Sequence, residues 1–422
     1  MMKKRKMGPN EKSSRKPSAN PASAPSPAKE EEEEGKKKEC REKRSRKEMN
    51  FTYASLDPVP VTKPGKHSAE EKRTHQGIPG IERLDSGRIF AVWYAGGKSE
   101  CRENYVVMSI SDDNGATWSG TVAVADPPHP DVRAFDSTCW ISPEGRFHWF
   151  WAQGCGGTDG SWENADGIAG VWFSVLENPE DDPGNFRFTP PRRISNGVMM
   201  NKPTVLSDGS WALPCSVWTG PFRRHESLDV RQGAMMLLSP DRGKTFEVRG
   251  RIAMDGVEGG ASFDEHMFVE LRSGRILCCL RTRKGIAESF SDDGGRTWST
   301  PRLSRTLSGP DSRFFLRRLR SGRLLLISND STCARERLSA FLSEDDGLSW
   351  PYRLLLDNRK PVSYPDAAES PAGTISLIYD CNRCNGGYIF LSQITEEDIL
   401  AGSLVTPASF LGREVSHSRP VS

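Results

Sequence analysis

The chain has 422 residues, among them 39 Gly, 29 Pro and 11 Trp, and its formal net charge is +2. That length suits one large domain or two smaller ones. No apolar run near the N-terminus is long enough for a signal peptide, and no stretch approaches the ~20 residues of a membrane span. We therefore expect a soluble protein without a membrane partner, cytoplasmic by default; an extracytoplasmic location stays open if translation starts elsewhere.

The first 50 residues differ in composition from the rest of the chain. They contain no aromatic residue and carry 16 Lys or Arg against 9 Glu, with runs such as KKRK (3–6) and EEEEE (30–34). A segment this polar buries too little apolar surface to offset the entropy lost on ordering. We predict a disordered, charged, low-complexity tail at 1–50 and a linker at 51–73. The basic runs are compatible with a nuclear-localisation or nucleic-acid patch, but we favour a solvated tail.

A hairpin pattern occurs six times in the remainder, at intervals of 48 to 65 residues. Each copy has an apolar residue, a short polar turn with a glycine, and then alternating apolar residues, which is typical of two strands joined by a tight turn. The turn glycines are Gly87, Gly145, Gly209, Gly274, Gly322 and Gly373. Periods near 50 residues with several short strands indicate a propeller. We predict an all-β, six-bladed β-propeller over 74–400 and a C-terminal tail at 401–422; a two-domain alternative would need a central linker, and none is visible.

Four octets share the pattern Ser-x-Asp-x-Gly-x-Thr/Ser-aromatic: SDDNGATW (111–118), SPDRGKTF (239–246), SDDGGRTW (291–298) and SEDDGLSW (343–350). Their Asp and Gly suggest a calcium loop, but such a loop needs more oxygen ligands and a terminal Glu. Asp can instead accept backbone N–H groups across a turn, and Gly allows a left-handed residue. The octets begin 17 to 30 residues after a turn glycine, where the third and fourth strands of a blade should meet. We interpret them as structural turns.

Octets at the blade turns of a six-bladed propeller resemble the Asp boxes, or BNR repeats, of the sialidase (neuraminidase) superfamily. The resemblance covers roughly residues 74–400. Asp boxes also occur in propellers without hydrolase activity, so by themselves they indicate the fold only. The resemblance implies a site at the propeller axis in which three arginines bind the sugar's carboxylate, a Tyr attacks the anomeric carbon, a Glu activates that Tyr and an Asp is the acid/base.

Four residues match this set. Tyr364, in SYPDAAESPAGTISLIYD, is similar to the nucleophile, and Glu265, in SFDEHMFVELRSGRILCCLR, is similar to the Glu that activates it. Arg281, sixteen residues after Glu265, and Arg335, three residues before an apolar strand that leads into an octet, resemble two of the arginines. The alternatives are a packed tyrosine, a solvated acid and surface ion pairs. Blade packing does not require all four residues together, which favours a site.

The sequence also departs from the family. Gly77 stands where an Arg-Ile-Pro motif has its arginine, and the loop that should carry the acid/base Asp, FAVWYAGGKSECRENYVV, has none. Counting back from the octet at 111 puts Glu100 nearest that place and Glu103 close by; either could act as general acid if its surroundings raised its pKa. Polar residues near the ends of early strands could bind a different sugar or simply be hydrogen-bonded in loops: His75, Gln76, Arg133 and Asp136.

We therefore expect a sialidase-like retaining exo-glycosidase that releases a terminal acidic sugar, sialic acid or a related one, with Tyr364 as nucleophile. Its partner would be a glycan or small acidic sugar; no cofactor or metal is required, and we expect no nucleic acid on the propeller. The alternatives are a non-catalytic carbohydrate-binding propeller, a protein-interaction scaffold, and a hydrolase or lyase acting on uronate-containing polysaccharide. The sequence does not specify the sugar, the linkage or the oligomeric state.

Overall fold

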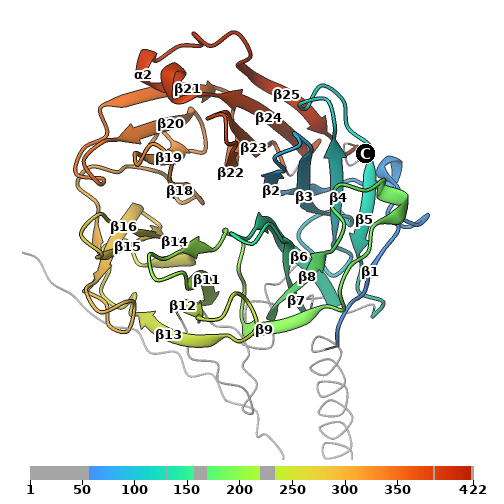
Figure 1. Ribbon diagram of the computed structural model, residues 1–422, viewed down its shortest axis with the longest axis horizontal. Coiled ribbons are helices and arrows are strands. Elements are labelled where there is room, and N and C mark those ends of the chain that lie inside the picture. The colour runs from blue at the N-terminus through green and yellow to red at the C-terminus, as the bar shows by residue number, and fades with distance from the viewer. Residues whose placement is uncertain (1–56, 130–131, 156–168, 219–232, 384, 420–422) are drawn as a thin grey trace, which may run out of the picture. The chain divides into compact units, whose positions relative to one another are not determined.

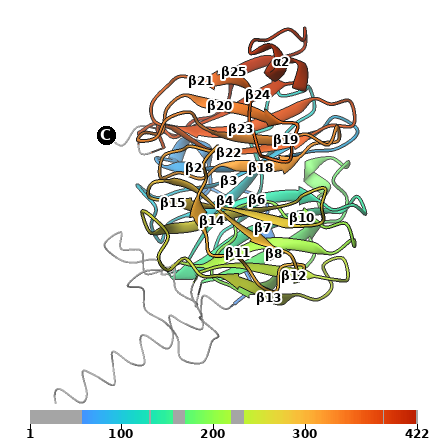
Figure 2. The ribbon, with the colours of Figure 1, turned by 90° about the vertical axis from the view of Figure 1, so that its left-hand side faces the viewer.

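The computed structural model describes residues 57–129, 132–155, 169–218, 233–383 and 385–419. Within these residues the strands form six antiparallel sheets that follow one another around a ring (Figure 1). The side view shows the strands of successive sheets running roughly side by side (Figure 2). The prediction of an all-β, six-bladed propeller is confirmed. The tail predicted for 1–50 and the start of the predicted linker lie outside the described residues.

Each blade is an up-and-down meander with its first strand nearest the centre of the ring. The first blade has β2 (Gln76–Arg83), β3 (Ile89–Ala95), β4 (Tyr105–Ser111) and β5 (Thr121–Ala125), with β1 (Val61–Thr62) paired outside β5. The second has β6 (Val132–Ile141), β7 (Phe147–Cys155), β8 (Gly170–Leu176) and β9 (Arg192–Asn196). The third has β10 (Thr204–Val205), β11 (Trp211–Val217), β12 (Gly233–Ser239) and β13 (Glu247–Ile252).

The other three blades repeat this order. The fourth has β14 (Ala261–Glu270), β15 (Ile276–Thr282), β16 (Gly285–Ser291) and β17 (Arg302–Leu303). The fifth has β18 (Phe315–Arg318), β19 (Leu324–Asn329), β20 (Leu338–Ser343) and β21 (Tyr352–Asp357). The sixth has β22 (Val362–Glu369), β23 (Ile375–Cys381), β24 (Tyr388–Ile394) and β25 (Phe410–Ser416). Helix α2 (Glu396–Ala401) and two 3₁₀ turns (Glu70–Lys72 and Pro183–Asn185) complete the described part of the chain, in which no helix has the length and apolar character to cross a membrane.

The predicted turns lie where the sequence pattern put them. All six turn glycines join the first strand of a blade to its second, with φ between 74° and 102°, a region that side-chain-bearing residues rarely adopt. Each octet joins the third strand to the fourth. In the octet at 291–298, Ser291 Oγ donates to Asp293 Oδ1 (2.8 Å) and Thr297 Oγ1 donates to Asp293 Oδ2 (2.6 Å). The aspartate oxygens are thus used inside the turn, as a structural role requires.

The propeller extends beyond the predicted boundaries at 74 and 400. Strand β25 lies in the segment predicted to be a tail and pairs with β24, and β1 lies in the predicted linker and pairs with β5. The pattern of β25, FLGREVS, does not alternate cleanly because most of its residues are only half-buried, and helix α2 separates it from the rest of its blade. In the sequence, β25 therefore lacks the alternation of apolar and polar residues by which the other strands were predicted.

Two buried cations connect the blades across the ring. Lys202, which precedes β10, donates from Nζ to the carbonyls of Ile81 and Ala367 and lies 3.4 Å from Glu82 and 3.5 Å from Asp366. Its ammonium therefore joins the third blade to the first and the sixth. Because unpaired buried charges are costly, the two carboxylates and the lysine stabilise each other only as a set.

Arg313, which precedes β18, is the second of these cations. Its Nη1 donates to the carbonyl of Met200 (2.9 Å), and its Nη2 donates to the carbonyls of Pro79 (3.1 Å), Tyr364 (3.0 Å) and Pro365 (2.9 Å). The guanidinium thus fixes backbone from the first, third and sixth blades at one point.

Several innermost strands are kinked at the same place. In the described residues, a non-glycine residue with positive φ occurs near the start of four of them, at a shift of register: Ile78 (53°), Asp136 (47°), Asp264 (47°) and Tyr364 (56°). Such a conformation costs about 1–2 kcal/mol per residue, and a bulge turns a side chain away from its regular direction. A repeated cost at equivalent positions suggests a site there.

Candidate active site

The kinked residues Ile78, Asp136 and Tyr364 border one cavity of about 180 Å³. Five further charged residues line it: Arg133, Arg335, Arg383, Glu100 and Glu265. The cavity lies near the beginnings of the innermost strands. The turn glycines and the octets follow the ends of first and third strands, which run in the same direction, so they lie at the opposite rim of the propeller.

The centre of the cavity is a hydrogen-bonded pair of Tyr364 and Glu265. The Tyr364 hydroxyl donates to Glu265 Oε1 (3.0 Å), and both residues are about 5 % exposed. Arg281 Nη1 donates to Glu265 Oε2 (2.7 Å) and to the Tyr364 hydroxyl (2.9 Å). A carboxylate thus stands ready to take the phenol proton, and a guanidinium stands ready to stabilise the phenolate oxygen.

Tyr364 is neutral in this state. Burial raises the pKa of its phenol, although the neighbouring Arg281 opposes the rise. The phenol therefore loses its proton only when a reaction at its oxygen makes the oxygen more acidic. Glu265 is the acceptor within reach.

Arg313 fixes the backbone around Tyr364. Arg313 holds the carbonyls of Tyr364 and Pro365, and its guanidinium carbon lies 5.4 Å from the centre of the Tyr364 ring. This contact holds the left-handed conformation that turns the tyrosine into the cavity. Arg313 was not singled out by sequence, because its partners are backbone atoms of distant blades.

Arg281, for which the family resemblance implies the role of a carboxylate ligand, is not among the residues that line the cavity. Its Nε donates to Asp311 Oδ1 (2.6 Å) and its Nη1 is shared by Glu265 and Tyr364. Arg335 does line the cavity; its Nη2 donates to the carbonyl of Asp311 (3.1 Å), and its guanidinium carbon lies 5.1 Å from the Tyr364 ring centre.

Glu100 and Asp136, two acids of the cavity, have pKa values shifted in opposite directions. Burial raises the pKa of Glu100, but Arg383 and Arg133 outweigh that effect and leave the pKa below its ordinary value. Burial raises the pKa of Asp136 to about 7; Arg133 opposes the rise, whereas Glu100 and Glu265 add to it. Near neutral pH, Glu100 is therefore ionised, while Asp136 can carry a proton. Asp136 Oδ2 has no hydrogen-bond partner among the described residues, which fits a protonated or substrate-binding carboxyl.

Arg133 contributes a third guanidinium. It is 2 % exposed, its carbon lies 4.1 Å from the Phe135 ring centre, and within the described part of the chain its Nε and Nη1 have no hydrogen-bond partner. Such donors favour an anionic or polar ligand. Arg133 is one of the residues predicted from the sequence to bind a sugar or to be hydrogen-bonded in a loop, and the structure brings it to the cavity.

Other predicted residues lie outside the cavity. Glu103 is exposed, while Glu100, three residues earlier, reaches the cavity. Gln76 is fully buried; its Nε2 donates to the carbonyl of Gly387 (2.9 Å) and its Oε1 accepts from Trp93 Nε1 (3.0 Å), so its amide joins the first blade to the last. His75 Nε2 lies 3.1 Å from the Tyr94 hydroxyl, which donates to Glu100 Oε1 (3.1 Å). His75 thus supports Glu100 through Tyr94.

Arg383 and two aromatic residues of the cavity were missed by sequence reasoning. Arg383 Nη1 donates to Glu100 Oε1 (3.1 Å), and its guanidinium carbon lies 4.5 Å from the Tyr364 ring centre. Trp218 and Phe263 pack edge to face, with ring centres 5.1 Å apart. Arg383 lies in the connection between β23 and β24; the corresponding connection differs in length from blade to blade, so no local pattern marks Arg383.

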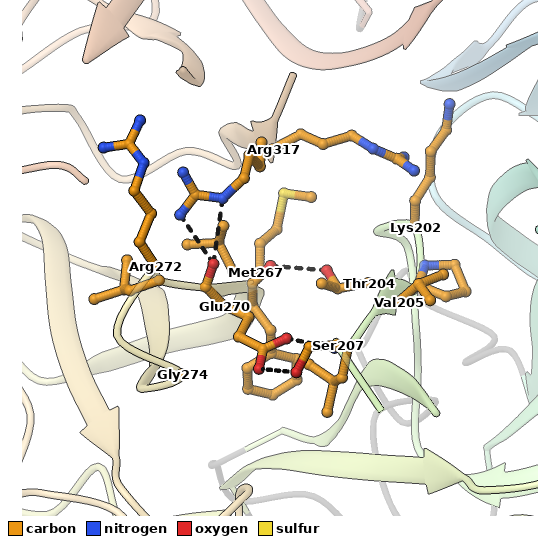
Figure 3. A pocket seen from close by; sticks show the side chains of 15 residues that line it. Lys202, Thr204, Val205, Ser207, Met267, Glu270, Arg272, Gly274 and Arg317 are labelled. Atoms are coloured by element: carbon orange, nitrogen blue, oxygen red, sulfur yellow. Dashed lines mark hydrogen bonds between the residues drawn. The ribbon is translucent and has the colours of Figure 1, made fainter. Parts of the chain in front are cut away.

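A larger cavity, of about 520 Å³, lies between the third and fourth blades at the opposite rim; Figure 3 shows Lys202, Thr204, Ser207, Glu270, Arg272 and Arg317 around it. Glu270, the only acid among its lining residues, accepts from the N–H (2.6 Å) and Oγ (2.7 Å) of Ser207. The lining of this larger cavity includes no tyrosine and no second acid, so the smaller cavity is the better candidate for catalysis. Among the described residues, no group of three or more His, Cys, Asp or Glu side chains is arranged to hold a metal ion.

Solved structures of sialidases and trans-sialidases have folds similar to that of this chain. The Hadza microbial sialidase Hz136 matches with a TM-score of 0.57 and 18 % identity, over 72 % of this chain and 63 % of that one, so this chain spans less than two thirds of its length. An intramolecular trans-sialidase from Ruminococcus gnavus, in complex with oseltamivir carboxylate, matches with a TM-score of 0.58 and 15 % identity, over 80 % of this chain and 97 % of that one. The leech intramolecular trans-sialidase matches with a TM-score of 0.58 and 14 % identity, over 82 % and 72 %. At such identities the likeness shows the fold alone.

A search of curated proteins found no match. The model of the BNR repeat-like domain matches residues 87–377, which is more than half of the chain. Together with the propeller shared with sialidases, this match confirms the superfamily resemblance predicted from the octets. The chain belongs to the family of proteins with a BNR repeat-like domain.

Proposed function

We propose that the protein is a retaining exo-glycosidase of the sialidase type, which releases a terminal acidic sugar from a glycan. The observation that carries the proposal is the buried pair of Tyr364 and Glu265, whose oxygens lie 3.0 Å apart beside a cavity lined by three arginines. A weak nucleophile next to its general base is the arrangement that covalent catalysis requires. Sialidases use a tyrosine nucleophile for this purpose.

In the first half of the reaction, a bond forms between Tyr364 Oη and the anomeric carbon while the bond from that carbon to the leaving oxygen breaks. The phenol proton passes to Glu265, and Arg281 stabilises the charge that develops on Oη during the transfer. An acid of the cavity protonates the leaving oxygen. In the second half, the conjugate base of that acid takes a proton from water, the water oxygen attacks the anomeric carbon, and Tyr364 leaves and recovers its proton from Glu265.

A phenol suits an acidic substrate. If the sugar carries a carboxylate on its anomeric carbon, an anionic nucleophile is repelled, whereas a neutral phenol is not. Arg335 and Arg383 both lie over the Tyr364 ring, at 5.1 and 4.5 Å from its centre, and Arg281 Nη1 lies 2.9 Å from the reacting oxygen. This supports a sialic acid or a related sugar acid as the substrate.

We assign the acid/base to Asp136, with Glu100 remaining ionised. The assignment rests on the opposite settings of two carboxyls that border the same cavity, because a general acid must hold a proton near the working pH. Asp136 can hold that proton up to about pH 7, whereas Glu100, beside Arg383, is ionised. Glu100 would then orient Arg383.

A second candidate function is a non-catalytic carbohydrate-binding propeller. The observation that favours it is Gly77, which removes the arginine expected before Ile78 and Pro79. In that case the arginines of the cavity would bind an acidic sugar without turnover.

A panel of fluorogenic glycosides tests the proposal. It includes sialosides and glucuronides, with neutral galactosides as controls, and the products are analysed by mass spectrometry. We expect release of the sialic acid, and product analysis also separates hydrolysis from intramolecular transfer. Cleavage of neutral glycosides only, or binding of acidic sugars without any cleavage, would contradict the proposal; the second result would favour the binding propeller.

A further inference from the structure

Gly77 and Arg383 share one space. A Cβ atom added to Gly77 would lie 2.7 Å from Cγ of Arg383, closer still to its Cδ, and 3.0 Å from Asp380 Oδ2. The aliphatic part of the Arg383 side chain, at Cγ and Cδ, therefore fills the space that a side chain at position 77 would need. Gly77 does not have a positive φ, so the backbone there accepts other residues and only the space is taken.

Asp380 holds the Arg383 side chain in one orientation. Its Nε lies 3.7 Å from Asp380 Oδ2, and Asp380 is itself fixed by the Ile78 N–H (2.9 Å) and by Ser363 Oγ (2.8 Å). Asp380 is 1 % exposed, so this contact is shielded from solvent. The Arg383 side chain is only 10 % exposed and has a fixed carboxylate beside it, so its guanidinium loses little freedom when a ligand binds, which favours binding.

The front of Arg383 faces the cavity. Its guanidinium carbon lies 4.5 Å from the Tyr364 ring centre, beside that of Arg335 at 5.1 Å. Its Nη1 donates to Glu100, while its Nη2 has no hydrogen-bond partner among the described residues. That donor is free for an anionic group of a ligand beside the Tyr364 ring.

We propose that Arg383 supplies the carboxylate-binding guanidinium that position 77 lacks, and that Gly77 is the residue that makes room for it. The inference rests on the proposed function in that its ligand is the carboxylate of the acidic sugar. The expected loss of one arginine at Gly77 is then compensated by an arginine from the β23–β24 connection, on the last blade. Arg383 determines specificity for acidic over neutral ligands.

Binding of a matched ligand pair tests this. Isothermal titration calorimetry measures oseltamivir carboxylate and its ethyl ester, which differ in the anionic group, against the full chain and its variants. We expect the wild-type protein to prefer the carboxylate, and Arg383→Ala to weaken carboxylate binding by about ten- to hundredfold, as for the loss of a charge-assisted hydrogen bond, with little effect on the ester. Arg383→Lys, which keeps the charge and most of the stem, should lose less. Arg413→Ala, on the outer strand β25, is the matched control and should bind both ligands as the wild type does.

The exchange between the two positions is tested by Gly77→Arg and by Gly77→Arg combined with Arg383→Ala. Two arginines compete for one space, so the single variant should bind the carboxylate poorly, and the double variant should recover at least part of the binding. Three results would overturn the inference: no preference for the carboxylate in the wild type, equal loss of both ligands in Arg383→Ala, or a double variant that binds no better than Gly77→Arg.

The inference and the proposed function fail separately. Carboxylate binding that depends on Arg383, without cleavage of any acidic glycoside, would support the inference and reject the function. Cleavage of sialosides with an unchanged KM in Arg383→Ala would reject the inference alone.

Discussion

The hydroxyl of Tyr364 lies 3.0 Å from Oε1 of Glu265, although 99 positions separate the two residues in the chain. Tyr364 comes from β22 of the sixth blade and Glu265 from β14 of the fourth, and Arg281 of β15 contacts both. The two blades are not neighbours in the ring, so the pair forms only because innermost strands converge on the axis. The proposed covalent catalysis requires this pair.

Removal of either member should lower turnover strongly with little effect on folding. Tyr364→Phe removes the nucleophilic oxygen, and Glu265→Gln removes the base; for the latter we expect kcat to fall by about 10²–10⁴-fold, and for the former by at least as much. Steady-state kinetics on an aryl sialoside measures both. Tyr388→Phe, which keeps the ring stacked on Phe390, is the control and should retain activity. Activity that survives both site changes would reject the mechanism.

The acid/base assignment predicts a dependence on the leaving group. Asp136→Asn should lower kcat/KM strongly for natural glycosides and much less for aryl glycosides, whose leaving oxygen needs no proton. In the wild type, kcat/KM should fall as the pH rises through about 7, because Asp136 must be protonated to act as an acid. Burial is the main cause of this raised pKa; Glu100 and Glu265 add to the rise, and Arg133 and Arg383 oppose it. Leaving-group dependence in Glu100→Gln instead of Asp136→Asn would give the role to Glu100.

The raised pKa of Asp136 should make the free energy of unfolding depend on pH. A carboxyl whose pKa rises on folding contributes stability in acid, and this contribution is lost as the pH rises from the ordinary value of 3.8 towards about 7. The difference corresponds to at most about 4 kcal/mol. Asp136→Asn does not titrate, so its stability relative to the wild type should increase between pH 4 and pH 7 in urea unfolding. A constant difference across that range would show that Asp136 has an ordinary pKa.

The lysine at the axis should be essential for stability but remote from catalysis. Lys202→Met leaves Glu82 and Asp366 without their cation, and breaking a buried pair in this way costs about 3–5 kcal/mol. Lys284→Met removes an exposed lysine paired with exposed Glu258 and should change the free energy of unfolding by less than about 1 kcal/mol. Chemical denaturation measures both; equal effects of the two changes would contradict the role assigned to Lys202.

The fold was predictable because its signals are local and repeated. Each turn glycine and each octet is defined within about a dozen residues, and six copies of the hairpin establish the period. Strand β25 escaped prediction because it is half-buried and does not alternate, so its pairing with β24 decides its conformation.

The site was predictable only in part. Tyr364, Glu265 and Arg335 lie in segments that carry family motifs, and Glu100 could be placed by counting from an octet. The contact of Arg383 with Glu100, 283 positions away, has no local signature, and neither has the meeting of Arg313 with the Tyr364 carbonyl. The pKa of Asp136 likewise depends on burial and on charges from other blades, which no spacing in the sequence reveals.

The most direct test of the central claim is to trap the covalent intermediate. The protein is treated with a 3-fluorosialosyl fluoride. The fluoride on the anomeric carbon is the leaving group, and the fluorine at C3 slows hydrolysis of the intermediate. The protein is then digested and analysed by mass spectrometry. The account predicts one sugar adduct on Tyr364, absent in Tyr364→Phe and much slower to form in Glu265→Gln. An adduct on another residue, or turnover of sialosides without any adduct, would contradict it.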